Sequence, residues 1–192
     1  EALMRPQLPT LRSPLTVMQL ASEMGRLYDI EKLTFFRACE CYEELEAAGK
    51  LDADALIFVN SIASVSLSDE DWASYCEAHS AILPKLVVEI TEEEEMNERE
   101  LERKRNVPGS SGVFALDDYG SGYSNGNSLL TIAPKYVKVD IAIIRGIDTD
   151  ADKQQFLMTL IDYAHPRGVQ VLAEGVETLS ELRKVLEMGV DL

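Results

Sequence analysis

Short apolar runs recur along the chain, and each is followed by a polar or charged side chain. The runs cover residues 55–59, 85–88, 113–116, 136–137 and 169–173. Apolar runs of this length, without strict alternation, are typical of strands buried on both faces of a parallel sheet. The residues that follow them are Asn60, Glu89, Asp117, Lys138 and Glu174. The pattern therefore predicts buried strands that each end in a polar group.

Segments with helical spacing separate these strands. The predicted helices lie near Val17–Met24, Ile30–Ala48, Asp69–Ile82, Thr91–Arg105, Ser128–Ile132, Asp150–Arg167 and Leu179–Met188. The polar strand ends recur roughly every 20 to 36 positions, about one strand plus one helix. This alternation predicts an α/β chain with a parallel sheet, of the TIM-like (β/α)8 barrel type. In such barrels the strand ends share one face, which is where barrel enzymes have their active sites.

The length suggests an incomplete barrel. The chain has 192 residues, whereas a complete barrel usually takes about 250. It begins at Glu1 and stops at Leu192, within what resembles the start of another strand. We therefore expect one domain over residues 1–192, truncated at both ends.

The net charge and the cysteine content limit which partners the protein can bind and in which cellular compartment it is expected. The net charge of -16 argues against a surface that binds DNA or RNA through phosphates. The acidic run at 92–102 has an ordinary explanation as a solvated helix face. Three cysteines form no even disulfide framework, and no apolar run approaches the roughly 18 residues that span a bilayer. We expect a cytoplasmic domain, either free or as the cytosolic part of a membrane-anchored protein.

The strand-end residues supply only oxygen ligands for a metal. Glu89, Asp117, Asp118 and Glu174 offer carboxylates, and Asn60 offers an amide oxygen. This set suits Mg²⁺ or Mn²⁺ rather than zinc. Because Asp117 and Asp118 are adjacent, one carboxylate can bridge two cations while its neighbour binds the second. Two such ions about 3.5 to 4 Å apart activate water in phosphodiester cleavage.

Taken singly, these residues also have structural explanations. An Asp-Asp pair before glycines often forms a turn, and a strand-end glutamate can interact with the N-terminus of the following helix. Lys138, which could orient the attacking water or neutralise phosphate charge, could equally be a solvated lysine. Their joint occurrence at the ends of successive strands favours a common site.

Six motifs, in this order, resemble those of the EAL domains, phosphodiesterases that linearise the bacterial messenger cyclic di-GMP. The resemblance covers essentially the whole chain, with Tyr119 and Ser121 in place of the family's Phe and Thr. The motifs are Glu1-Ala2-Leu3, Val59-Asn60-Ser61, Glu89-Ile90-Thr91-Glu92, the loop from Asp117 to Ser124, Lys138-Val139-Asp140 and Glu174-Gly175-Val176-Glu177-Thr178.

The resemblance implies a role for each matching residue. A first cation would be bound by Glu1, Asn60, Glu89 and Asp117, and a second by Asp117, Asp118 and Glu174. Lys138 would position the nucleophilic water, with Glu174 as a possible proton acceptor. Arg5 would contact a substrate phosphate, Glu177 would line the site, and Glu92 would support the loop Tyr119–Ser124.

The resemblance also implies partners and marks three departures. Cyclic di-GMP would be the ligand, the domain would form a homodimer, and regulatory domains would be attached elsewhere in the protein. The family's strand before E-A-L is absent, its late glutamine would lie beyond Leu192, and Asn125-Gly126-Asn127 continues the loop more loosely than usual.

Three functions remain open on the sequence. The first is a phosphodiesterase that converts cyclic di-GMP to linear pGpG with two Mg²⁺ or Mn²⁺ ions. The second is a weak or inactive module that acts as a cyclic di-GMP receptor or a protein-interaction domain. The third is an aldolase that uses Lys138 as a Schiff base. That chemistry needs a neutral lysine, whereas several nearby carboxylates should keep Lys138 charged.

Overall fold

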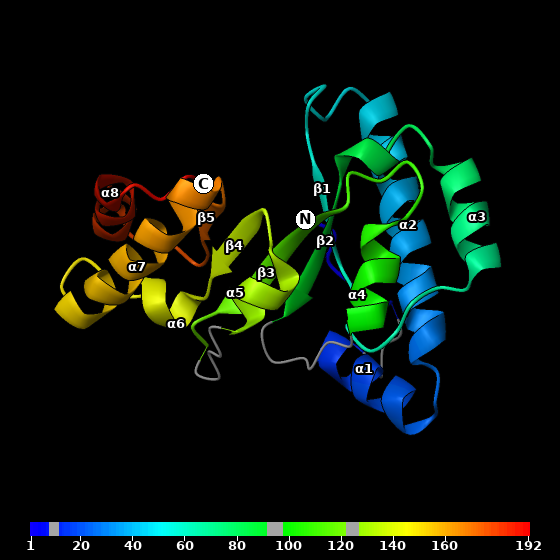
Figure 1. Cartoon of the computed structure of the whole chain (residues 1–192), viewed down its shortest axis with the longest axis horizontal. Helices are drawn as coiled ribbons and strands as arrows, with labels where there is room; N and C mark the ends of the chain where they lie inside the picture. Colours follow the sequence, from blue (N-terminus) through cyan, green and yellow to red (C-terminus); the bar gives the residue numbers. More distant parts are fainter. Residues whose placement is uncertain (8–11, 92–97, 122–126) are drawn as a thin grey trace. The chain divides into compact units, whose positions relative to one another are not determined.

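The computed structural model (Figure 1) describes residues 1–7, 12–91, 98–121 and 127–192. The chain divides into two compact units. The first contains residues 1–89 and 95–113, and the second contains residues 90–94 and 114–192. Glu92 and part of the loop Tyr119–Ser124, both predicted to be functional, lie outside the described residues.

Five strands form the sheet, in the same order as in the sequence. They are β1 (Ile57–Asn60), β2 (Leu86–Thr91), β3 (Val113–Tyr119), β4 (Tyr136–Val139) and β5 (Gln170–Ala173). The β1–β2, β3–β4 and β4–β5 pairs are parallel, and β4 is buried along its whole length. Sequential parallel strands joined by helices confirm the predicted α/β class of the TIM-like type.

Helices of the first unit flank β1 and β2. They are α1 (Pro14–Glu23), α2 (Leu27–Ala47), α3 (Asp69–Ala78), the 3₁₀ helix η1 (Leu83–Lys85) and α4 (Glu98–Arg105). The Ser68 hydroxyl caps α3 by accepting a hydrogen bond from the Asp71 amide at 3.1 Å. The predicted helix Asp69–Ile82 is too long, because α3 ends at Ala78 and Pro84 lies in the separate η1 turn. Thr91, predicted as helical, ends β2 instead.

Helices of the second unit are mostly short. They are α5 (Asn127–Ile132), α6 (Ile141–Ile144), α7 (Ala151–Ala164), the 3₁₀ helix η2 (His165–Arg167) and α8 (Leu179–Met188). The predicted helix Asp150–Arg167 is divided, since Pro166 lies in η2 and Gly168 follows with φ of 68°. The four-residue α6 was not predicted; the Asp140 carboxylate caps it by accepting from the Ala142 amide at 2.8 Å.

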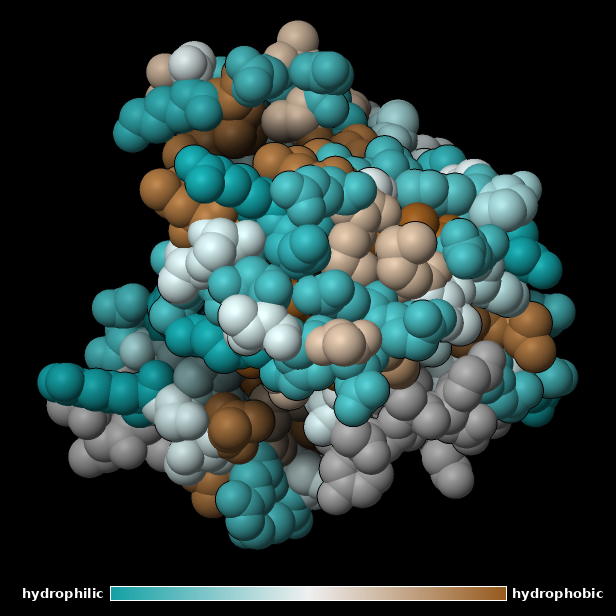
Figure 2. Space-filling model, turned by 90° about the vertical axis from the view of Figure 1, so that its left-hand side faces the viewer, coloured by the Kyte–Doolittle hydropathy of each residue, from teal (hydrophilic) through white to brown (hydrophobic). Residues whose placement is uncertain are grey.

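The surface reflects the excess of acidic residues. Figure 2 shows a face that is largely hydrophilic, with hydrophobic patches between the polar groups. Apolar side chains on α8 contribute to the exposed surface of the second unit: Leu179, Leu182 and Leu186. Among the helices that the structure describes, none has both the length and the apolar character needed to cross a membrane.

Candidate metal centre

An irregularity in β3 brings two adjacent carboxylates together. The pairing of β3 with β4 shifts register between Leu116 and Tyr119, and Asp118 lies between them with φ of 54°. In a regular strand, adjacent side chains point to opposite faces, but a bulge can re-aim one of them. Oxygen atoms of Asp117, Asp118 and Glu174 consequently all lie within 4.8 Å of one another.

Lys138 contacts this cluster from β4. Its Nζ lies 2.9 Å from Asp117 Oδ1 and 2.8 Å from Glu174 Oε1. The Lys138 side chain is only 6% exposed, so its charge interacts with these carboxylates at reduced solvent screening. Strand pairing holds the geometry: the Glu174 amide donates to Val139 O at 3.0 Å. Three ionised carboxylates against one ammonium leave an excess of negative charge, which favours binding of a cation.

The donor chemistry of this cluster fits a hard divalent cation. Asp117, Asp118 and Glu174 offer carboxylate oxygens alone, the ligand type that Mg²⁺ and Mn²⁺ prefer. Their mutual distances, within 4.8 Å, are short enough for a single ion to be bound by all three. The structure thus brings together the three residues predicted for the second cation, with Lys138 beside them.

The first unit gathers a second set of predicted ligands. The Ala2 amide donates to Phe58 O at 2.8 Å, which places the Glu1 segment beside β1. Carboxylate oxygens of Glu1 and Glu89 lie within 4.8 Å of each other. Asn60 donates through Nδ2 to Glu89 Oε2 at 3.1 Å. This contact uses the amide nitrogen of Asn60 and not its amide oxygen, which is the atom that a cation would bind. The bridging role of Asp117 stays a prediction.

The segment after Glu174 is fixed by its neighbours in the second unit. Gly175 has φ of 67°, and a Cβ at this position would lie 2.5 Å from side-chain atoms of Ile141. Glycine is therefore required both by the backbone and by the close approach. Glu177, predicted to contact substrate, forms a two-point ion pair with Arg145, with both N–O distances at 2.5 Å.

A glutamate that the sequence analysis missed secures the same segment. Glu181, only 2% exposed, accepts hydrogen bonds from the amides of Gly146 at 2.8 Å, Glu177 at 3.1 Å and Thr178 at 3.0 Å. In turn, the Thr178 hydroxyl accepts a hydrogen bond from the Glu181 amide, which completes a capping box at the start of α8. The sequence does contain the pattern that predicts such a capping box, T-x-x-E before an apolar helix. These bonds, that of Gly146 foremost, lower the pKa of Glu181 from 4.5 to about 2.

The lowered pKa predicts acid sensitivity. Since the folded-state pKa lies below the unfolded value, ionised Glu181 stabilises the fold above pH 4.5, and this contribution is lost as pH falls toward about 2. Glu181→Gln should therefore lower the melting temperature at pH 7, and the gap to the parent should narrow at pH 3. Thermal unfolding of metal-free protein measures both. The control is Glu187→Gln, which changes an exposed α8 glutamate that pairs with Lys184. An equal gap at both pH values would contradict the assignment.

Arg5 is exposed, and its Nη1 donates to the neighbouring Met4 carbonyl at 3.0 Å. Its predicted contact with a substrate phosphate stays a prediction.

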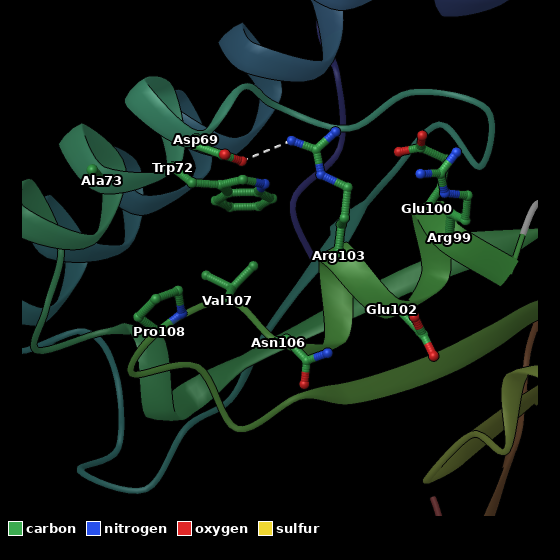
Figure 3. A pocket seen from close by; sticks show the side chains of 10 residues that line it. All are labelled: Asp69, Trp72, Ala73, Arg99, Glu100, Glu102, Arg103, Asn106, Val107 and Pro108. Atoms are coloured by element: carbon green, nitrogen blue, oxygen red, sulfur yellow. Dashed lines mark hydrogen bonds and ion pairs between the residues drawn. The ribbon is translucent and has the colours of Figure 1, made fainter.

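A cavity in the first unit lies between α3 and α4 (Figure 3). It has a volume of about 800 Å³ and is lined by Trp72 of α3, by Arg103 of α4 and by Val107 and Pro108 after α4, among others. Arg103 pairs with Asp69 across it at 2.8 Å. None of its ten described lining residues belongs to the predicted site, so the acidic clusters rather than this cavity define the candidate centre.

Relatives with curated descriptions match the chain at modest identity. The chain is 27% identical over 175 residues to a probable cyclic di-GMP phosphodiesterase, PdeG, of Escherichia coli, covering 88% of this chain and 34% of that protein. It is 26% identical over 199 residues to the cyclic di-GMP phosphodiesterase PdeB of Shewanella oneidensis, covering all of this chain and 23% of that protein. The chain thus spans about a third or less of these relatives.

Solved structures show the same fold. The phosphodiesterase PaMucR in complex with c-di-GMP superposes with a TM-score of 0.81 at 22% identity, covering 98% of this chain and 78% of that one. BlrP1 of Klebsiella pneumoniae, solved with manganese and c-di-GMP, gives a TM-score of 0.75 at 22% identity, covering 95% of this chain and 46% of that one. The family model described as EAL domain matches residues 1–192, and the chain therefore belongs to the EAL domain family.

Proposed function

We propose that this domain hydrolyses cyclic di-GMP to linear pGpG with two divalent cations, Mg²⁺ or Mn²⁺. The observation that carries the proposal is the cluster of Asp117, Asp118 and Glu174 oxygens within 4.8 Å, with Lys138 in contact with two of them. The printed descriptions of relatives as cyclic di-GMP phosphodiesterases support the choice of substrate.

The proposal assigns a role to each predicted site residue. One cation would be bound by Asp117, Asp118 and Glu174. The other would be bound by Glu1, Asn60 and Glu89, with Asp117 as a ligand shared by both. When bound, the cations supply an activated water and stabilise charge on the phosphate. Lys138 places an ammonium beside the Asp117–Glu174 pair, where it can orient the attacking oxygen and stabilise its developing charge. Glu174 can accept the proton that the attacking water loses.

The wider context is also part of the proposal. The domain would act in the cytoplasm, a compartment consistent with its three free cysteines. It would work as a homodimer, with Arg5 and Glu177 at the nucleotide. Regulatory domains would be attached, as the greater length of the curated relatives suggests.

Hydrolysis should depend strictly on added divalent cations. Purified protein incubated with cyclic di-GMP and Mn²⁺ should produce pGpG, identified by chromatography, and excess chelator should stop the reaction. Restoring Mn²⁺ should restore it. Turnover that persists in chelator would overturn the metal-dependent mechanism. Nucleotide binding without turnover in saturating Mn²⁺ would instead place the domain in the receptor class.

A further inference from the structure

A buried ion pair contacts the residues that follow Asn60, one of the predicted ligands of the first unit. Lys104 of α4 and Glu31 of α2 are each 1% exposed, and Lys104 Nζ donates to Glu31 Oε1 at 2.6 Å. Figure 1 shows α4 beside α2. A buried pair of this kind is costly to desolvate and is not by itself evidence of stabilisation. Its position relative to β1 gives it a different significance.

The pair holds the chain where it leaves β1. Glu31 accepts from the Ser61 hydroxyl at 2.6 Å and from the Ile62 amide at 2.8 Å. Lys104 donates to the same Ser61 hydroxyl at 2.5 Å and to Ile62 O at 3.0 Å. The two residues that follow Asn60 are therefore held by both members of the pair, through side-chain and backbone atoms.

The same turn connects to Glu89. The Ser61 amide donates to Glu89 O at 3.0 Å, and Asn60 Nδ2 contacts the Glu89 carboxylate. Displacing Ser61 would therefore move both predicted ligands, Asn60 and Glu89. Groups that orient metal ligands through hydrogen bonds are commonly worth tenfold or more in metal affinity.

Resting on the proposed function, we infer that Glu31 and Lys104 are positioning residues for the cation bound in the first unit. They hold Ser61 and Ile62 so that the Asn60 amide and the Glu89 carboxylate face one ion. Neither Glu31 nor Lys104 is among the predicted ligands of the cation or the substrate. Their effect is exerted through the geometry of the β1 exit, so it should appear in metal affinity before any chemistry takes place.

The test measures Mn²⁺ binding to metal-free protein by the loss of the free-ion paramagnetic resonance signal. The double variant Glu31→Leu/Lys104→Met removes both charges together, and such neutral replacements of buried pairs commonly preserve folding. One of the two Mn²⁺ binding steps should weaken by about tenfold or more. Glu31→Gln, which keeps one oxygen for the Ile62 amide, should weaken the same step less and provides the test if the double variant does not fold.

The control is Leu101→Ala, which removes buried packing from the same helix, α4, without touching the pair. It should lower the melting temperature and leave both Mn²⁺ affinities near the parent values. Parent-like affinities in the folded pair variants, or an equal loss in Leu101→Ala, would overturn the positioning role alone. If the parent binds no Mn²⁺, the proposed function itself fails, and the inference with it.

Discussion

Replacing Lys138 with methionine should lower kcat by about 10²- to 10³-fold, the usual effect of removing one preorganised group that stabilises transition-state charge. Nucleotide affinity should change by less than about tenfold, or 1.4 kcal/mol, because the ammonium acts mainly on the attacking oxygen. Cation affinity should not fall, since Lys138 contacts Asp117 and Glu174 and its charge opposes a cation there. Single-turnover kinetics and Mn²⁺ titration separate the three quantities.

Lys135 offers a matched control for this variant. It directly precedes β4 and donates to Gly168 O at 2.6 Å on the exposed surface, so Lys135→Met should retain parent kinetics. Lys138→Arg should not rescue activity, because a planar guanidinium cannot replace a compact ammonium at these distances. Near-normal hydrolysis by Lys138→Met would refute the assigned role. Trapping of a carbonyl substrate on Lys138 by borohydride would favour the aldolase mechanism instead.

Asp118→Asn should abolish most hydrolysis while leaving the metal-free protein at least as stable as the parent. The change removes one of three clustered carboxylates. It should therefore weaken binding of the second cation, and it relieves the repulsion between the carboxylates when no cation is bound. Asparagine also tolerates the left-handed backbone of this position, where φ is 54°. A loss of at least about 10²-fold in kcat/KM is expected, by analogy with other removed charge-stabilising groups.

Melting temperature with and without Mn²⁺ checks the second half of this expectation. The parent should gain stability when Mn²⁺ is added, by linkage to binding, and Asp118→Asn should gain less. Asp162→Asn, which alters an exposed carboxylate on α7, should behave as the parent in both assays. A marked drop in melting temperature of metal-free Asp118→Asn would show that the carboxylate serves the turn rather than a cation.

Apolar patterning was sufficient to predict the strands and their order of appearance. Each predicted strand exists. Continuous apolar runs indicate strands buried on both faces, and β2 and β4 fit this, whereas β1 and β5 are only partly buried. Helix ends were less predictable, because both α3 and α7 stop earlier than their apolar spacing indicates. α3 ends at Ala78, well before the 3₁₀ turn that contains Pro84, and α7 ends at Ala164, directly before the 3₁₀ turn that contains Pro166. The short α6 depends on its Asp140 cap rather than on any periodic pattern.

The residues of the candidate site could be predicted from the sequence, but the backbone irregularity and the ion pair that position them could not. Asp117, Asp118, Lys138 and Glu174 are brought together, as their strand-end positions indicated. The bulge in β3 was not foreseen, since a register shift depends on pairing with β4 and leaves no periodic signature. The pairing of Glu31 with Lys104 joins residues 73 positions apart, a distance over which a single sequence carries no pattern.

The left-handed backbone of Asp118 reverses the ordinary ranking of substitutions at this position. Glutamate would keep the charge, but its longer side chain is poorly suited to the positive φ of 54° that asparagine and glycine accept. A charge-conserving exchange is therefore the less conservative one for the fold. For trapping bound nucleotide in an inactive protein, the neutral asparagine is the better choice, because it changes the chemistry and leaves the backbone as it is.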